Sequence, residues 1–204
     1  TSYLVTVRQL LHDPGGLYWS TSDLTVYLNS GMQERDLLSG INRNLYTLTL
    51  TAGTATYNFT AVGNASIFDV VGITVRYGNL QVQLDQVSYT VLLKQYQPWT
   101  TYQYVPRAFA RQGHSSVVLG PAPASAYVSV WDCCVYSPAL VAGTDADPVP
   151  YPYTECVPYF AAYMAKLNER QVAEAQHYFE RFQQHLAIAQ SARVGLSPVA
   201  YPRR

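Results

Sequence analysis

Residues 148–192 read PVPYPYTECVPYFAAYMAKLNERQVAEAQHYFERFQQHLAIAQSA, a proline-rich stretch that leads into a long amphipathic segment. From Thr154 onward, apolar residues recur at the spacing of one helical face. This segment predicts a long C-terminal helix over residues 153–192, with Asn168 marking either a bend or the boundary between two successive helices. The apolar stripe must pack against another part of the chain, and it consists of Val157, Ala161, Met164, Ala175, Phe179, Phe182 and Leu186.

The N-terminal part, residues 1–45, supplies the expected partner for that stripe. A short helix is predicted from Tyr3 to Leu11, and a second one over residues 22–39, where Gly40 is a natural stop. Packing of the second helix against the C-terminal one would form a small helical bundle. Arg35 falls near the middle of the apolar face of the second helix. We expect it to pair with an acid on another element or subunit, with extension of its head group to the surface as the alternative.

Between these helical parts, residues 46–136 have the pattern of strands. Tyr46, Leu48 and Leu50 alternate with threonines, and residues 57–60 are expected to return as the second strand of a hairpin. Further hairpins are predicted for residues 67–77 with 80–84 and for 109–111 with 116–119, and a last strand over 126–136; residues 87–93 fit either a strand or a short helix.

The predicted fold is therefore α+β. A small helical bundle, made of the early helix and the long C-terminal helix, carries an inserted antiparallel β module of about six short strands, forming a sheet or barrel. A proline-rich crossover over 137–152 returns from the module, and residues 193–204 form an extended C-terminal arm.

Composition limits the classes of function. Thirteen basic and 13 acidic residues give a net charge of zero, which argues against binding nucleic acid through its phosphates. Charged residues make up only 13% of the chain, while there are 18 tyrosines and 3 tryptophans. Large protein interfaces have this bias, but so does a tyrosine-rich core whose hydroxyls reach the surface. Both interpretations remain open on composition alone.

The sequence predicts no catalytic, cofactor or metal site, because no motif brings a nucleophile, a base and an orienting group together. We expect Cys133, Cys134 and Cys156 to be reduced and structural, since their number is odd and no C-x-x-C occurs. Asp145 and Asp147 fit turn chemistry before a proline better than a calcium site. The sequence contains no run of about 18 apolar residues, so it predicts no membrane span. We expect assembly in a reducing cytosol.

An aromatic cluster stands out in the loop before residue 106. Its members are Tyr96, Trp99, Tyr102 and Tyr104. Such a cluster could stack on a sugar or fill a contact between subunits, and we favour the contact. Together with Arg35, these residues are our candidates for a subunit or tail contact.

The order of several short segments resembles the head-to-tail adaptor family of tailed bacteriophages, also called connector or head-completion proteins. The resemblance covers most of the chain and rests on segments at 19–24, 28–29, 69–75, 106–110, 118–123, 136–140, 147–150 and 159–163. They read WSTSDL, LN, DVVGITV, PRAFA, VLGPAP, YSPAL, DPVP and YFAAY, in that order. The unusual tyrosine content and the Cys133–Cys134 pair depart from the family pattern.

The resemblance implies a homo-oligomeric ring, commonly of twelve copies, that binds beneath the portal protein at the capsid vertex of the virion. It implies assembly in the host cytoplasm and an extended channel through which DNA passes without specific binding. It also implies a platform for a tail or nozzle protein. It implies no enzymatic activity, no cofactor and no membrane partner. We expect the C-terminal arm to dock on the portal through Val194, Leu196, Pro198, Val199, Tyr201, Pro202, Arg203 and Arg204. The competing class is a carbohydrate- or protein-binding module that uses the tyrosine- and tryptophan-rich β surface.

Overall fold

The computed structural model describes residues 2–63, 66–95, 102–141 and 145–194. The chain divides into two compact units. The helical unit combines residues 1–41 with 137–204, and the β unit is the continuous stretch 42–136 inserted between them. This confirms the α+β class and the packing of the C-terminal helical region on the early helix. The first strand of the β unit begins at Arg43.

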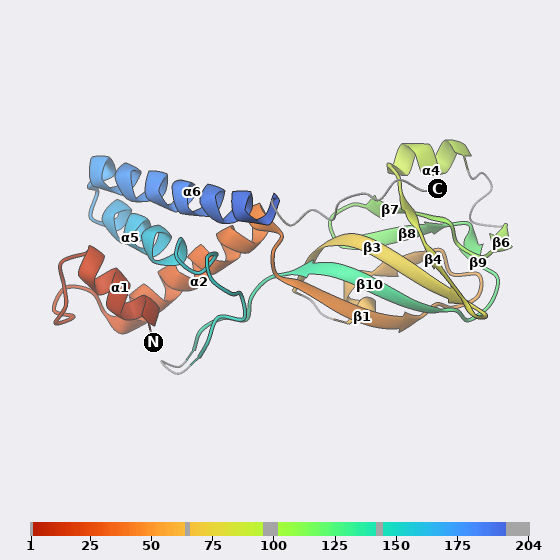
Figure 1. Ribbon diagram of the computed structural model, residues 1–204, viewed down its shortest axis with the longest axis horizontal. Helices are drawn as coiled ribbons and strands as arrows, with labels where there is room; N and C mark the ends of the chain where they lie inside the picture. The colour runs from red at the N-terminus through yellow and green to blue at the C-terminus, as the bar shows by residue number, and fades with distance from the viewer. Residues whose placement is uncertain (1, 64–65, 96–101, 142–144, 195–204) are drawn as a thin grey trace. The chain divides into compact units, whose positions relative to one another are not determined.

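The helical unit contains α1 (Ser2–Leu10), α2 (Thr21–Ser39), α5 (Val157–Asn168) and α6 (Val172–Val194). The side chain of Ser20 caps α2 by accepting the N–H of Asp23 at 3.1 Å. Gly40 ends this helix in the left-handed conformation at φ 56°. Helix α5 packs against α1, α2 and α6, and it is the central element of the bundle (Figure 1).

The single long C-terminal helix that we predicted is two helices. Of the two alternatives left open at Asn168, the boundary is the one observed, since α5 ends there and α6 begins at Val172. Arg170 adopts φ 61° in the turn, and the ammonium group of Lys166 donates to Glu169 at 3.0 Å and to Gln171 at 2.9 Å. The turn folds α6 back along α5, so the apolar residues of both helices face one core (Figure 1).

The β unit is built from two four-stranded sheets and a two-stranded one. The first sheet, which we call the outer sheet, has the strand order β1-β10-β3-β4 and is antiparallel throughout. The second has the order β2-β8-β7-β5, and β6 pairs with β9. The bounds are β1 Arg43–Thr49, β2 Thr56–Asn58, β3 Ile67–Tyr77, β4 Leu80–Gln83, β5 Asp85–Gln86, β6 Gln103–Tyr104, β7 Ala108–Gln112, β8 Ser116–Gly120, β9 Ala122–Pro123 and β10 Val128–Val135, with short helices α3 at Phe59–Val62 and α4 at Tyr89–Gln95.

Two of the predicted hairpins are present and one is wrong. Strands β3 and β4 form a hairpin around Gly78, and β7 and β8 form another around Gly113. The predicted hairpin between residues 46–50 and 57–60 does not form, because β1 pairs with β10 and β2 pairs with β8 in the other sheet. The turn at Gly53, with φ 76°, carries the chain from one sheet to the other.

Two smaller expectations are also resolved. The module is not wholly antiparallel, because β5–β7 and β6–β9 are parallel pairs. The ambiguous stretch 87–93 contains a helix, α4. The core between the two four-stranded sheets is apolar, and the edge of the Tyr57 ring contacts Trp131 with 6.0 Å between ring centroids.

Candidate interaction surface

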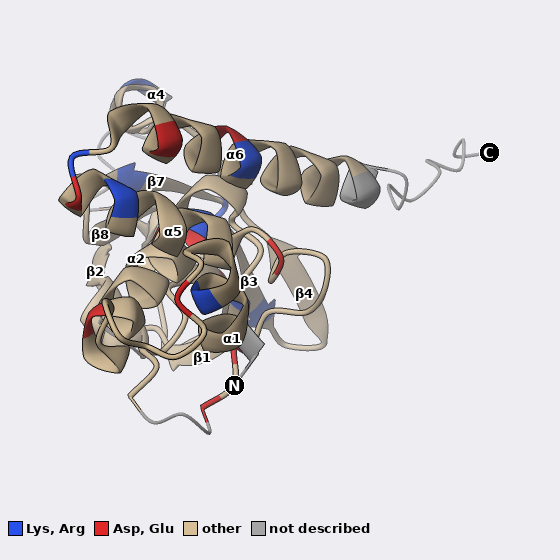
Figure 2. Cartoon of the chain, turned by 90° about the vertical axis from the view of Figure 1, so that its left-hand side faces the viewer, with Lys and Arg blue, Asp and Glu red and all other residues tan. Residues whose placement is uncertain are grey.

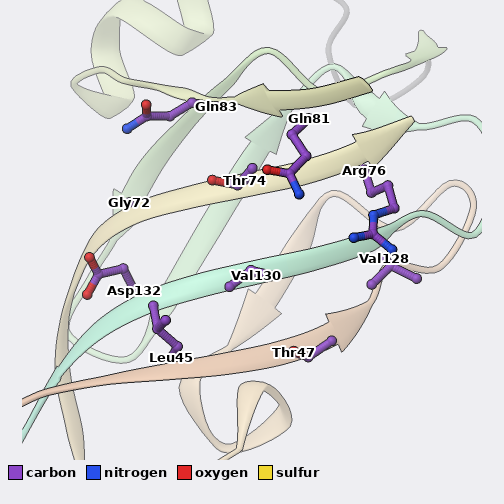
Figure 3. A pocket seen from close by; sticks show the side chains of 10 residues that line it. All are labelled: Leu45, Thr47, Gly72, Thr74, Arg76, Gln81, Gln83, Val128, Val130 and Asp132. Carbon is purple, nitrogen blue, oxygen red and sulfur yellow. The ribbon is translucent and has the colours of Figure 1, made fainter. Parts of the chain in front are cut away.

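One open feature of the β unit is the face of the outer sheet that points away from its core. Side chains alternate along a strand, so Trp131 and Cys133 of β10 enter the core while Val130 and Asp132 point outward. The outward residues line a shallow hollow of about 590 Å³ (Figure 3). They are Leu45, Thr47, Gly72, Thr74, Arg76, Gln81, Gln83, Val128, Val130 and Asp132.

Three exposed apolar side chains lie on this outer face among threonines, glutamines and charged residues. Leu45 is 72% exposed, and Val128 and Val130 are 41% and 38% exposed. Gly72 leaves a gap in the middle of the face, since a Cβ placed there would meet no atom within 4 Å. Exposed Leu and Val side chains next to an open sheet face are compatible with a protein contact, which burial in a partner would test.

The outer face carries two charged residues, Arg76 and Asp132, on its two central strands. Arg43 of β1 forms a side-chain ion pair with Asp132 of β10, and both side chains remain about one-third exposed. The side chain of Arg76 extends from β3 toward Val128 on β10 (Figure 3). The helices of the helical unit also carry few charged residues (Figure 2). The outer face is thus suited to a largely neutral partner surface.

A second, smaller hollow of about 350 Å³ lies beside β4. It is lined by Tyr77, Val82, Gln83, Asp85, Tyr104, Val105 and Arg107. The guanidinium carbon of Arg107 lies 6.0 Å from the centroid of the Tyr104 ring, which is the geometry of a cation–π contact. Tyr104 also stacks on Tyr102, with 6.3 Å between ring centroids.

These positions bear on the predicted aromatic cluster. Tyr102 and Tyr104 lie together and are 58% and 49% exposed, so both rings are accessible for a contact. Tyr96 and Trp99, the other two members of the cluster, lie outside the described residues. So do all residues of the predicted portal-binding arm except Val194, which is the last residue of α6.

Arg35 has the acid partner on another element that we expected, Asp147, whereas its assignment to a subunit contact requires a correction. Arg35 is fully buried, so its side chain offers no surface to a neighbouring subunit. It pairs instead with acids of its own chain: it donates to Asp36 Oδ1 at 2.8 Å and forms a bidentate contact with Asp147. The same guanidinium also donates to Ser137 Oγ at 2.9 Å. A buried cation needs such a set of acceptors, because an unpaired one would be very costly.

This cluster fastens the crossover 137–152 to α2. The second oxygen of Asp36 accepts the N–H of Ser137 at 2.7 Å. Asn29, nearly two turns earlier on α2, accepts the N–H of Leu140 at 2.7 Å and donates to its carbonyl at 3.1 Å. Asp147 also accepts the N–H of Val149 at 2.9 Å, so its expected turn role is present alongside its bond to Arg35.

Tyr3 of α1 completes the cluster by donating its hydroxyl to Asp147 Oδ2 at 2.7 Å. Burial and this bond to a carboxylate raise the pKa of Tyr3 well above its ordinary value. The hydroxyl therefore remains a donor at any physiological pH. We interpret the cluster as structural, because its polar groups bond to one another.

The three cysteines form no disulfide bonds and are buried. Burial raises the pKa of the Cys133 thiol, and likewise that of Cys156, to about 12. Cys156 precedes the first turn of α5, where a thiolate would normally be favoured, but burial outweighs that position. Neither thiol has the lowered pKa that a nucleophile needs.

Within the described ranges, no group of three or more histidine, cysteine or acidic side chains is arranged to hold a metal ion. His185 stacks on Tyr159 with 4.8 Å between centroids, and its Nδ1 lies 3.6 Å from Glu155 Oε2. Among the described helices, none has the length and apolar character required to cross a membrane.

Sequence reasoning did not identify the outer face. The alternation in residues 43–49 and 128–135 was the available signal, because it includes Leu45, Val128 and Val130 on the side opposite Trp131. The signal was missed because β1 was assigned to the wrong partner. Only the pairing of β1 with β10 brings these three apolar residues onto one surface.

Comparison with known proteins places the chain in a recognisable group. The sequence matches the model of the SU10 adaptor protein family over residues 2–202. The match spans residues of both the helical unit and the β unit. No curated protein matches the sequence.

Proposed function

Because the chain belongs to the SU10 adaptor protein family, a family of phage head–tail adaptors, we propose that it forms a closed ring beneath the portal and carries the tail. The family match establishes a structural adaptor role in the phage particle. We further propose twelve copies per ring, a central channel that DNA crosses without specific binding, and a lower surface that receives a tail or nozzle protein.

The observation that carries this proposal is the family match over nearly the full chain. The surface chemistry supports it. The net charge is zero and charged residues are only 13% of the chain, which suits large permanent contacts and a channel that does not hold phosphates. The exposed outer face and the Tyr102–Tyr104 pair supply surface for such contacts.

The test is the mass of the purified protein, alone and mixed with portal rings, by light scattering and native mass spectrometry. We expect a closed oligomer, formed either alone or on the portal, with a mass near twelve chains. A protein that stays monomeric and does not bind portal rings would overturn the proposal.

We propose that the C-terminal arm contributes the portal contact. Pro198 and Pro202 favour an extended chain, and Leu196, Val199 and Tyr201 provide apolar anchors beside the doubly basic end. Removal of residues 195–204 should weaken binding to portal rings while the circular dichroism of the helical unit is unchanged. Unaltered portal binding would contradict this role.

The aromatic cluster provides a second test and addresses the carbohydrate-binding alternative. Replacement of Trp99 and Tyr102 by alanine should weaken ring or tail assembly if the cluster lies in a contact. If the stacked Tyr102–Tyr104 pair binds sugars instead, the wild-type protein should select defined glycans on an array and the double variant should not. We expect no glycan binding.

A further inference from the structure

The outer sheet ends in two strands whose outward backbone groups form no hydrogen bonds within the described part of the chain. Leu50 donates its N–H to Tyr127 O at 2.8 Å, and Val135 donates to Asn42 O at 2.9 Å. Since bonding alternates along an antiparallel pair, the even-numbered residues of β1 bond to β10. The N–H and C=O groups of Leu45 and Thr47 therefore point away from the sheet.

The same reasoning applies to β4 at the opposite edge. Leu84 donates its N–H to Ile73 O at 2.9 Å, which makes Leu80 and Val82 the residues that bond to β3. The backbone groups of Gln81 and Gln83 consequently point away from β3. At both edges, the residues with outward backbone groups are those whose side chains line the outer face. If the two edges were joined, the outer faces of both sheets would lie on the same side.

Strands β1 and β4 contain neither lysine nor proline, two residue types that normally prevent edge strands from pairing. Natural edge strands are protected by lysines, prolines, bulges or covering segments. Strand β1 reads RNLYTLT, and its one charged residue, Arg43, is already paired with Asp132. Strand β4 reads LQVQ and has no charge, and β1 and β4 are both free of proline and lysine. Both edges are thus chemically suited to accept another strand.

We propose that neighbouring copies of this chain join by pairing β1 of one subunit with β4 of the next, so that the outer sheet continues from subunit to subunit. Strands β1 and β4 run in opposite directions within the sheet, so this junction is antiparallel. The two joined surfaces differ, which is the head-to-tail arrangement that a ring requires. Pairing of β1 with β1 would give a two-fold dimer and stop there. The inference rests on the proposed ring and names the contact that builds it.

The junction also gives the exposed Leu45 a neighbour. Leu45 stands at the β1 edge and is 72% exposed in the single chain. In the joined sheet its side chain lies beside Gln81 or Gln83 of the next copy, because cross-strand neighbours on one face lie in contact distance. The hollow on the outer face then lies on one sheet surface that continues from subunit to subunit.

Cysteine cross-linking tests the junction directly. Thr47→Cys and Gln81→Cys are introduced singly and together, and assembled protein is mildly oxidised. The native thiols are buried and provide a low background. The double variant should give a covalent series longer than a dimer, and each single variant should give none. Dimers from Thr47→Cys alone would overturn the proposal in favour of β1–β1 pairing.

Charge substitutions test the same contact without covalent cross-linking. Thr47→Lys combined with Gln81→Lys should raise the concentration needed for half-assembly about tenfold, whereas Thr47→Lys with Gln81→Glu should restore it. Both lysine positions are exposed strand edges, and circular dichroism confirms that each variant folds. A ring that forms normally with both lysines, and that shows no cross-links in the double cysteine variant, overturns the junction but leaves the ring intact. Failure of the wild-type chain to form any ring, alone or on portal, overturns the proposed function itself.

Discussion

The helical unit and the β unit achieve their folds by different means. The helical unit joins two distant parts of the chain, and it fixes their relation with buried polar bonds between α2 and the crossover 137–152. The β unit is one continuous stretch with an apolar core, in which the Ser129 hydroxyl accepts a hydrogen bond from Trp131 Nε1 at 2.8 Å. Directional bonds define the path of a returning segment more narrowly than apolar contact does. The β unit instead leaves a face and two edges open for partners.

The largest expected effect comes from removing the buried cation that holds α2 to the crossover 137–152. Arg35→Ala leaves Asp36 and Asp147 buried without their cation, and should lower the free energy of unfolding by about 3–5 kcal/mol. The loss is measured by urea unfolding followed through the helical circular dichroism. Arg43→Ala is the matched control, since it breaks a pair that is about one-third exposed and should cost about 1 kcal/mol or less. Equal losses of stability in the two variants would contradict the claim that the buried Arg35 cluster stabilises the protein more than the partly exposed Arg43–Asp132 pair.

The next effect separates the two faces of the outer sheet. Ile73→Ala removes a fully buried side chain from the core and should cost about 3 kcal/mol. Val130→Ala, on the outward face of the neighbouring strand, should cost about 0.5 kcal/mol or less. Fluorescence of the buried Trp131 follows both unfolding transitions. A comparable loss at Val130 would mean that the side chains of the outer face are already buried in the purified protein.

A smaller effect comes from acid. Asp13 accepts the N–H groups of Leu17, Tyr18 and Trp19 at 2.8, 3.1 and 3.0 Å and so holds the loop between α1 and α2. Burial alone would raise the pKa of Asp13, but these bonds and Arg8 outweigh it and lower the pKa.

Because the pKa of Asp13 is lower in the folded state, its stabilisation is present above the ordinary aspartate pKa of about 3.9 and is lost as the pH falls below it. We expect Asp13→Asn to reduce stability at pH 7 and to flatten the loss of helical signal in acid. Thermal unfolding of both proteins at several pH values measures this. An unchanged acid profile in the variant would show that other carboxylates control it.

Elements of the fold could be predicted from the sequence where the residues that specify them lie close together in the chain. Helix α2 has its cap, apolar face and glycine stop within about 20 residues, and it forms where expected. The β3–β4 and β7–β8 hairpins have their turns in the sequence at Gly78 and Gly113. The partner of β1 (Arg43–Thr49) lies far along the chain, at Val128–Val135, and no local pattern specifies it.

The same limit applies to the functional residues. Arg35 was correctly expected to have a partner, but that partner is Asp147, which was assigned to a turn alone. Tyr102 and Tyr104 were recognised because their side chains are conspicuous by type and close in sequence. The outer face was missed because its members come from four strands that only the sheet order brings together.

The smallest expected effect compares the two units within one experiment. The thiolate is the form that reacts with a thiol reagent, and a pKa of about 12 for Cys133 and for Cys156 leaves roughly one thiol in 10,000 ionised at pH 8. Labelling of either cysteine must therefore proceed through opening of its own unit. We expect Cys156 to react more slowly than Cys133, as measured by mass spectrometry of the labelled peptides, because the crossover bonds hold the segment around Cys156.

Arg35→Ala sharpens that comparison, because it weakens the crossover bonds beside Cys156 and touches nothing in the core around Cys133. It should accelerate labelling of Cys156 by the factor that corresponds to its loss of stability, about 100-fold or more, and leave Cys133 unchanged. Equal acceleration at both cysteines would mean that the two units open together, and the division between a polar-fastened unit and an independent β unit would then not hold in solution.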